Sequence, residues 1–330
     1  MDKEKSGSRS VGSSRKLRKI ILWVVVGIVI LLAVVYIAVG VVGAKQLTLP
    51  KRVFDPALNP GVYNLKYEDL RIPARNDGLE IAAWYIPSEQ NEKAIILVHG
   101  RDNSRTNGFC DQFVSFANVL HQAGFSVMMI DLRGHGESED SRYHFGIKER
   151  QDILGAVDWL ESQGYQPGKI GVLGYSLGAG SVIGAAAEEG DIGAIWIDSA
   201  YADINSVITR NFKMESGLPS VFLYSVKAMV RLLYGFDITE SRPIAEIGKI
   251  APRPIFVAHC EKDNMIPFSH MEQLLSVAQN THTWAISNCD QNSVGKNFVP
   301  EKYNNHAIGY CVQPDEYGQK AIQFFDENLK

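Results

Sequence analysis

Hydrophobic and polar positions divide the chain into two unlike parts. Residues 20–43, IILWVVVGIVILLAVVYIAVGVVG, form one apolar stretch without a charge, and about 20 apolar residues suffice to cross a hydrocarbon core roughly 30 Å thick. Four basic residues lie between Arg15 and Lys19, and positive residues stay on the cytoplasmic side. The pattern predicts a single-pass signal anchor at the cell membrane. Residues 1–19 form a disordered cytoplasmic stub, and the rest of the chain is extracytoplasmic.

A cleaved signal peptide is the alternative, but the apolar stretch exceeds the usual length of about 7–15 residues. Residues 44–64 carry Pro50, Pro56 and Pro60 and are interpreted as a linker. We therefore expect the anchor to contribute no residue to a functional site. A chain that begins near Gln46 should then be soluble and active.

From residue 65 to residue 330 the pattern is regular. Alternating residues at 67–72 and 79–86 flank Asn76-Asp77-Gly78, which is typical of a β-hairpin. Short apolar runs, typical of strands buried on both faces, follow at 94–98, 126–130, 170–173, 194–197 and 255–258. Helical patterns lie at 109–122, 148–163, 177–189 and 314–329. This alternation predicts an α/β fold with a mostly parallel sheet and helices on both faces.

Residues 201–250 interrupt the alternation between two predicted strands. They contain an apolar helical segment at 220–234, and the sequence predicts a small helical lid inserted at the edge of the sheet. The whole chain has 45% hydrophobic residues, 21% charged residues and a net charge of −4. These values indicate a globular protein and argue against a nucleic-acid partner, which would require a basic excess.

The sharpest chemical signal is Gly174-Tyr175-Ser176-Leu177-Gly178. It lies between a predicted strand and a predicted helix, which is the context of a G-x-S-x-G nucleophile elbow. Glycine at 174 and 178 removes side chains that would clash in so tight a turn. The motif predicts Ser176 as a nucleophile at a helix N-terminus, whose partial positive charge favours a developing oxyanion.

A serine nucleophile needs a base, and the base needs a carboxylate that orients it. The chain order for this fold is Ser, then Asp or Glu, then His. His306 lies in a polar stretch before the last helix and is the predicted base, whereas His259, His270 and His282 have structural interpretations. Asp263 follows the strand at 255–258 and is the predicted acid; Asp198 and Glu261 are the rival candidates.

The oxyanion hole requires two backbone N–H groups. Leu177 follows the nucleophile and should provide one, and Arg101, in the loop after the strand at 94–98, should provide the other. The Arg101 side chain is interpreted either as a ligand for an anionic substrate group or as a solvated charge.

Together these motifs resemble the α/β-hydrolase superfamily. The resemblance rests on His99-Gly100, residues 131–138 (DLRGHGES), residues 174–178, Asp263 before Ile266-Pro267, and His306. It is nearest to serine aminopeptidase S33-like and dienelactone-hydrolase-like members and to membrane-tethered relatives of the abhydrolase 13 and 17 type. The resemblance implies a Ser-His-Asp triad without metal or cofactor, and it implies that residues 131–138 form a structural turn.

Three functions remain open at this point. The first is an esterase or lipase-like hydrolase of a small-molecule or lipid ester, in which the lid walls an acyl pocket near the membrane. The second is a peptidase or amidase in which Glu215 or Glu240 holds a substrate amino terminus. The third is a tethered binding module without catalysis.

The four cysteines are Cys110, Cys260, Cys289 and Cys311. Their spacing lacks the C-x-x-C pairs of zinc and redox motifs, and three complete pairings are possible. Because Cys289 and Cys311 bracket the segment that carries His306, we expect a disulfide between them.

Overall fold

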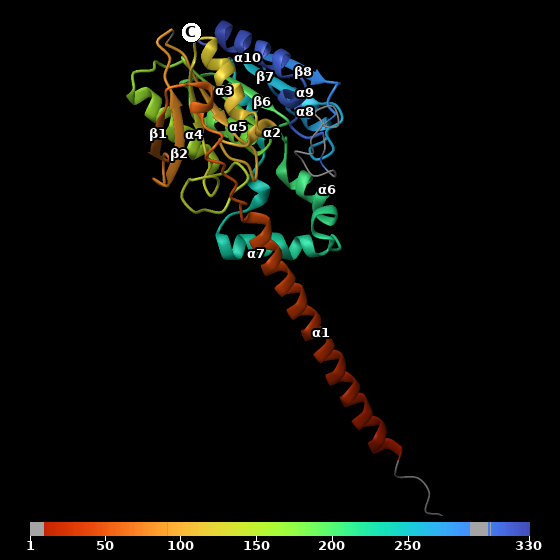
Figure 1. The fold of residues 1–330 in the computed structure, drawn as a ribbon. Helices are drawn as coiled ribbons and strands as arrows, with labels where there is room; N and C mark the ends of the chain where they lie inside the picture. Colours follow the sequence, from red (N-terminus) through yellow and green to blue (C-terminus); the bar gives the residue numbers. More distant parts are fainter. Residues whose placement is uncertain (1–9, 91, 291–302, 304) are drawn as a thin grey trace, which may run out of the picture.

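The computed structural model describes residues 10–90, 92–290, 303 and 305–330. Its centre is an eight-stranded sheet in the order β1-β2-β4-β3-β5-β6-β7-β8 (Figure 1). Strand β2 pairs antiparallel with β1 and β4, and the remaining neighbours pair in parallel. The strands are β1 Glu68–Pro73, β2 Glu80–Ile86, β3 Ala94–Val98, β4 Ser126–Ile130, β5 Ile170–Tyr175, β6 Ile192–Asp198, β7 Ile255–Cys260 and β8 Thr281–Ile286.

These strands confirm the predicted hairpin and the five predicted apolar strands. Every residue of β3, β4, β5 and β7 is buried, as expected for strands covered on both faces. The parallel strands therefore end at one common edge of the sheet. Residues that follow β3, β5, β6 and β7 meet at this edge.

Helices cover both faces of the sheet and enclose two hydrophobic cores. One core contains side chains of α4 and α5, and the other contains side chains of α3 and α10. The helices of these layers, with the short helices between them, are α2 Gly108–Asp111, α3 Phe113–Gln122, α4 Glu149–Ser162, α5 Leu177–Glu188, α8 Ser269–Leu275, α9 Gly309–Val312 and α10 Pro314–Asn328. A parallel sheet between two helical layers is confirmed.

The helix predicted over 109–122 is interrupted at its start. Phe109 and Cys110 lie within α2 with non-helical φ values of 49° and 58°, and the regular helix α3 begins only at Phe113. The Phe109 ring packs against Phe113, Tyr175 and Tyr310 with centroid distances of 5.3, 4.8 and 5.3 Å. These ring contacts stabilise a backbone conformation that is unusual for residues other than glycine. Local periodicity could not predict the break, because it carries no information on distant partners.

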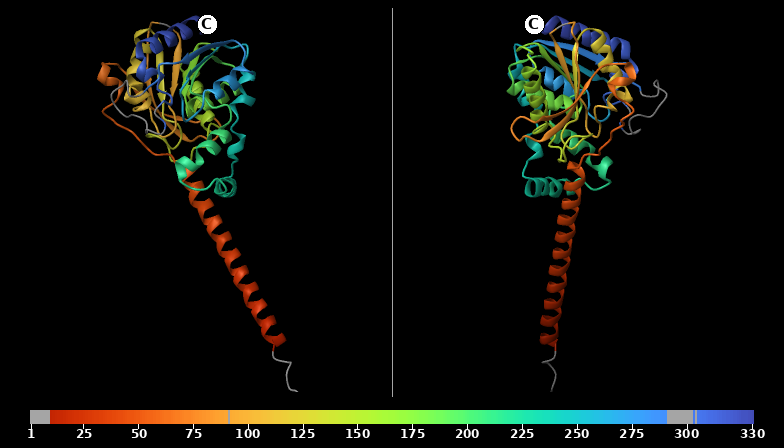
Figure 2. Two further views of the ribbon diagram at one scale, coloured as in Figure 1. Left: turned by 90° about the vertical axis from the view of Figure 1, so that its right-hand side faces the viewer. Right: turned by 60° about the vertical axis from the view of Figure 1, so that its left-hand side comes forward.

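Helix α1, Ser10–Thr48, projects far from the domain (Figures 1 and 2). Its Arg15–Thr48 portion is long and apolar enough to cross a membrane. The helix already includes residues 10–19, where the sequence predicted a disordered stub, and residues 1–9 of that stub lie outside the described residues. It also continues beyond the predicted anchor to Thr48, and both Ala44 and Thr48 are fully buried against the domain.

The chain after α1 lies on the domain and is not a free linker. The Lys51 backbone N–H donates to Asp102 Oδ1 at 2.9 Å, and the Arg52 guanidinium donates to the carbonyl oxygen of Gly136 at 2.9 Å. A short 3₁₀ helix, η1 Pro60–Tyr63, begins at Pro60 behind the Asn59 cap. These bonds fix the end of α1 relative to the sheet edge.

Residues 201–250 form the insertion between β6 and β7. They contain α6 Ile204–Ser216, α7 Phe222–Tyr234 and three 3₁₀ helices, η2 Ile238–Glu240, η3 Pro243–Ala245 and η4 Ile247–Ile250. Helix α7 lies across the base of the domain, meaning the side from which α1 leaves (Figure 1). There it packs against α1: the Tyr36 hydroxyl donates to the Val221 carbonyl at 3.0 Å.

Candidate functional site

Ser176 lies in a strained turn between β5 and α5. Its φ of 55° and ψ of −119° fall outside the ordinary regions for a residue with a side chain. A Cβ on Gly174 would approach the Gly178 carbonyl group at 2.8 Å, and one on Gly178 would approach the His99 carbonyl oxygen at 2.5 Å. Only glycine fits at either position, so the two glycines allow this backbone to hold Ser176 at the sheet edge, where it lines a cavity.

A chain of two hydrogen bonds joins three side chains from three loops. His306 Nε2 lies 2.8 Å from Ser176 Oγ, and His306 Nδ1 lies 2.8 Å from Asp263 Oδ2. The structure therefore brings together the nucleophile, base and acid that the sequence predicted. The imidazole is placed to receive the proton of the Ser176 hydroxyl while Nδ1–H donates to the carboxylate.

The turn after β7 holds Asp263 in its ionised form. Asp263 Oδ1 accepts the backbone N–H groups of Met265 and Ile266 at 2.9 and 2.8 Å. Burial alone would raise the pKa of this carboxyl group, but the charge of His306 and the hydrogen bonds of His259 and His306 outweigh it. The pKa of Asp263 consequently lies well below its ordinary value.

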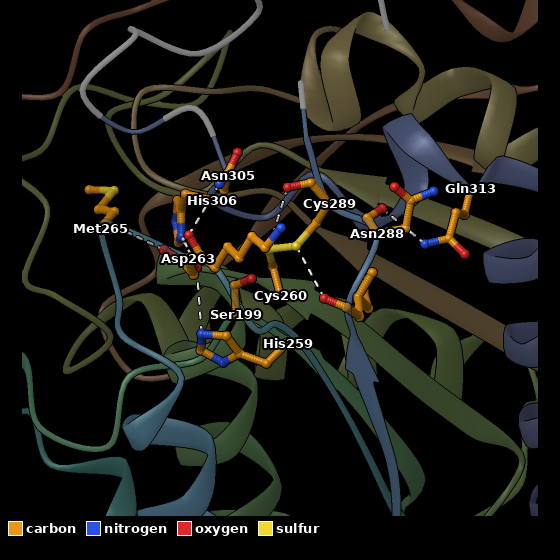
Figure 3. Close-up of a disulfide and its surroundings, with 12 residues drawn as sticks. Ser199, His259, Cys260, Asp263, Met265, Asn288, Cys289, Asn305, His306 and Gln313 are labelled. Atoms are coloured by element: carbon orange, nitrogen blue, oxygen red, sulfur yellow. Dashed lines mark hydrogen bonds and ion pairs between the residues drawn. A yellow bond between two sulfur atoms is a disulfide. The ribbon is translucent and has the colours of Figure 1, made fainter. Parts of the chain in front are cut away.

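His259 supports this turn and is not bonded to Ser176. Its Nε2–H donates to the Ile266 carbonyl at 2.8 Å, and Nε2 lies 3.5 Å from Asp263 Oδ2 (Figure 3). The Nε2 atom therefore contacts both the carboxylate and the far side of the loop that carries it. The sequence predicted a structural role for His259 without identifying the group it contacts.

The four other acidic and histidine candidates have different surroundings. Asp198 is buried and accepts hydrogen bonds from the Ser199 hydroxyl at 2.9 Å and the Tyr317 hydroxyl at 3.1 Å. His270 Nδ1 accepts the Ala202 backbone N–H at 3.2 Å. The last two residues are Glu261, which is exposed, and His282, whose ring stacks near Phe256. In the described part of the chain, none of these four side chains is hydrogen-bonded to His306 or Ser176.

The loop after β3 faces the N-terminus of α5. Neither Arg101 nor Leu177 donates its backbone N–H to an acceptor within the described residues. Both N–H groups therefore remain available for a ligand oxygen beside Ser176, as an oxyanion hole would require. Arg101 and Leu177 also line the same cavity as Ser176.

Two histidines, which the sequence analysis did not assign to the site, hold this loop. His99 Nε2 accepts the Leu132 backbone N–H at 3.0 Å, and His135 Nε2 accepts the Asp102 backbone N–H at 3.2 Å. Burial lowers the pKa of His99 to about 4 and that of His135 to about 3. Both rings are therefore neutral near pH 7, which lets them accept these bonds. In the sequence, the position of His135 within residues 131–138 was the available signal for this role.

The expected disulfide between Cys289 and Cys311 is wrong. The structure pairs Cys110 with Cys311 and Cys260 with Cys289. Figure 3 shows the second disulfide beside Asp263 and His306. The Cys260–Cys289 bond joins the end of β7 to the segment directly after β8, and the Cys110–Cys311 bond joins α2 to α9. Sequence spacing could not predict this pairing because it depends on which strands become neighbours.

A cavity of about 1310 Å³ extends from Ser176 to α1. The end nearest the hydroxyl contains Arg101, Glu215, Tyr303 and His306. The lid contributes apolar side chains of α6 and α7, and α1 contributes Ala38, Val39, Val42 and Gly43. The expectation that the anchor provides no residue to the site is therefore wrong. The sequence could not predict this contribution because the contact between α1 and the lid depends on tertiary packing.

The charged groups in this cavity partly neutralise one another. Arg101 Nη1 lies 3.8 Å from Glu215 Oε2, and its Nε lies 3.5 Å from Asp102 Oδ2. Glu215 Oε1 also accepts the Tyr303 hydroxyl at 2.6 Å. Glu240 is exposed and does not line the cavity. Among the described residues, no cluster of His, Cys, Asp and Glu side chains is placed to hold a metal ion.

The sheet order, the elbow after β5 and the loops at one sheet edge define the α/β-hydrolase fold. Residues 74–224 match the family profile of the X-Pro dipeptidyl-peptidases of family S15. The Pyrococcus furiosus esterase Pf2001 superposes with a TM-score of 0.65 at 22% identity, covering 85% of this chain and 99% of that chain. The acylaminoacyl peptidase of Pyrococcus horikoshii superposes with a TM-score of 0.55 at 15% identity, covering 80% of this chain and 42% of that chain.

Among curated sequences, the uncharacterized protein YqkD of Bacillus subtilis is 24% identical over 255 residues, which cover 76% of this chain and 77% of that protein. These similarities support the α/β-hydrolase superfamily. The finer assignment to an S33-like or dienelactone-hydrolase-like group stays a prediction.

Proposed function

We propose that the protein is a membrane-anchored serine hydrolase that cleaves carboxylic esters through an acyl-enzyme on Ser176. The observation that carries the proposal is the Ser176–His306–Asp263 chain, with both hydrogen bonds at 2.8 Å. The Ser176 hydroxyl lines the cavity at the N-terminus of α5, beside two N–H groups without acceptors in the described structure. This combination supports nucleophilic attack on a carbonyl group.

The reaction has two halves. Ser176 Oγ attacks the ester carbonyl carbon while its proton passes to His306 Nε2, and the Arg101 and Leu177 N–H groups bind the resulting oxyanion. The C–O bond to the leaving group then breaks, and the departing alcohol takes the proton from His306. Water gives a proton to His306 and attacks the acyl carbon. The Oγ–C bond then breaks, His306 returns its proton to Oγ, and the carboxylic acid leaves with the Ser176 hydroxyl restored.

Ester cleavage is favoured over aminopeptidase activity by the surroundings of Glu215. This carboxylate receives the Tyr303 hydroxyl and lies near Arg101, so it is a poor partner for a substrate amino terminus. The S15 profile match and the acylaminoacyl peptidase neighbour keep peptide cleavage as the second candidate. Turnover of aryl esters compared with aminoacyl amides distinguishes them, because an amide leaving group needs stronger protonation.

The contacts of α1 support an uncleaved anchor. Ser225 Oγ donates to the Tyr36 carbonyl at 2.8 Å, and the Ala44 side chain is fully buried in the domain core. Cleavage after α1 would remove both contacts. We propose that the basic residues at 15–19 lie in the cytoplasm and the hydrolase domain outside. External protease added to intact spheroplasts should then remove the domain. Full protection from the protease would contradict this topology.

The catalytic proposal is tested with the full chain in detergent micelles. Ser176→Ala should abolish labelling by a fluorophosphonate probe and lower aryl ester hydrolysis by several orders of magnitude, roughly the loss seen when a triad serine is removed. Ser181→Ala is the matched control, because Ser181 lies one turn along α5 and only donates to the Leu177 carbonyl. Equal labelling of both variants would contradict the assignment of Ser176, and an unmodified chain that is not labelled at all would favour a binding module.

A further inference from the structure

The cavity is polar at one end and apolar at the other. Polar side chains gather around Ser176, whereas Val39 and Val42 of α1 lie with Val207 and Ile208 of α6 along the far part. Val42 is 56% exposed although it lines this cavity, so the apolar end is open beside α1. A cavity of this shape suits an amphiphile with its ester at Ser176 and its chain directed toward α1.

The open end lies at the height where the hydrocarbon region would stop. The charge-free stretch begins at Ile20, directly after Lys19. At 1.5 Å per residue, a hydrocarbon core about 30 Å thick takes up about 20 helical residues. Counting from Ile20 therefore places the outer hydrocarbon boundary close to Val39, one of the residues that line the cavity.

Helix α7 crosses α1 at this same height. Two hydrogen bonds join it to Tyr36, whose hydroxyl donates to the Val221 carbonyl and whose carbonyl accepts from Ser225 Oγ. A Cβ on Gly40 would approach Ser225 Oγ at 2.0 Å. The absence of a side chain at Gly40 thus lets the two helices touch. Figure 1 shows α7 lying across the base of the domain, with α1 continuing past it. The crossing places α7 roughly along the plane of the membrane surface.

The outward face of α7 is largely apolar, although it also carries Arg231, whose side chain is 69% exposed and lies 2.6 Å from Asp237 Oδ2. Val221, Tyr224 and Leu232 are 56%, 75% and 73% exposed, and Ala228 lies between the last two on the same face. The opposite face, with Leu223, Val226 and Val230, is buried in the domain core. One face of α7 therefore packs on the domain core, and the other faces away from the domain. A helix whose exposed side is this apolar, and which leaves the domain on the anchor side, is suited to lie in a lipid interface.

We infer that the substrate is a long-chain acyl ester resident in the outer leaflet, which reaches Ser176 laterally along α1. This inference rests on the proposed function and names its substrate class. The acyl chain lies against Val39 and Val42, and α7 holds the opening at the hydrocarbon boundary. Water and the lipid ester are converted to a fatty acid and the alcohol of the headgroup, with the acyl group carried on Ser176 Oγ between the two halves.

The test uses the full chain in phosphatidylglycerol–phosphatidylcholine vesicles. Two substrates are compared: a fluorogenic palmitoyl ester within the bilayer and water-soluble p-nitrophenyl acetate. Val42→Trp fills the α1 side of the cavity, and Val41→Trp is its matched control, because Val41 neighbours it on α1 without lining the cavity. Val42→Trp should lower palmitoyl ester hydrolysis relative to acetate hydrolysis at least about tenfold, or about 1.4 kcal/mol in the barrier. Val41→Trp should leave both rates unchanged.

Three results would overturn the inference. They are unchanged palmitoyl ester hydrolysis by Val42→Trp, equal loss of palmitoyl ester hydrolysis in the two tryptophan variants, and an unmodified chain that hydrolyses acetate but not the palmitoyl ester in vesicles. In each case Ser176-dependent acetate turnover would leave the proposed function standing. Conversely, acetate hydrolysis that survives Ser176→Ala would refute the proposed function itself. The two failures are therefore distinguishable.

Discussion

Asp198 and Asp263 both lie at the carboxyl ends of neighbouring parallel strands, yet their surroundings differ in kind. Asp198 ends β6 among neutral hydroxyl groups, and burial raises its pKa to about 6. Asp263 follows β7 and receives two backbone N–H groups and an imidazole, which hold its pKa below the ordinary value despite burial. Burial is similar in the two places, so the donors decide which carboxylate stays charged.

The largest effect is expected at Asp263. Asp263→Asn should lower kcat by up to about 10⁴-fold with little change in KM, because an amide can stabilise the wrong tautomer of His306 and cannot stabilise the imidazolium. The measurement is steady-state hydrolysis of an aryl ester by the full chain in detergent. If Asp263→Asn is nearly normal and Asp198→Asn is crippled, the acid lies after β6.

A smaller effect is expected at His259, which positions the turn without contacting Ser176. His259→Phe removes the hydrogen bond to the Ile266 carbonyl and the neighbour of Asp263 Oδ2. A hydrogen bond to a charged group contributes about 1.5–3 kcal/mol, so kcat should fall roughly 10- to 100-fold. His259→Gln, which can still donate, should recover part of the loss. A purely structural role would lower the melting temperature in both variants and leave kcat of the folded fraction unchanged.

The smallest catalytic effect is expected at Asp198, where the effect should appear in stability. Asp198→Asn should change kcat by less than about tenfold, because the carboxylate is not bonded to His306. An unfolded aspartate titrates near pH 3.9, whereas burial raises the pKa of Asp198 to about 6 in the folded protein. The ionised form is therefore destabilised in the fold, and its contribution to stability falls as the pH rises from about 4 to 6.

The Asn variant lacks this titration. Its free energy of unfolding should improve relative to the unmodified protein by up to about 3 kcal/mol between pH 4 and pH 7. Thermal or denaturant unfolding at several pH values checks the sign. A difference that does not change with pH would show that Asp198 is not the group that titrates.

The features that the sequence predicted correctly depend on local patterns, and those that it missed depend on contacts between distant segments. Apolar runs and the glycines around Ser176 are local signals, and they located the strands and the elbow. The chain order that places Asp263 and His306 after Ser176 was sufficient to select side chains that the structure brings into contact. The disulfide partners, the break at Phe109 and the cavity wall on α1 depend on contacts between distant segments. No spacing rule carries that information.

The two disulfides impose an order on how the site can be completed. Cys110 pairs with Cys311 across 201 residues, and Cys260 pairs with Cys289 across 29 residues. His306 lies between Cys289 and Cys311, so each end of its segment is tied to a different part of the fold. The long-range bond can form only after almost the entire chain has been synthesised and has reached oxidising surroundings. Until that bond forms, the segment that carries His306 is not cross-linked at its C-terminal end, and only the 29-residue Cys260–Cys289 loop can hold it.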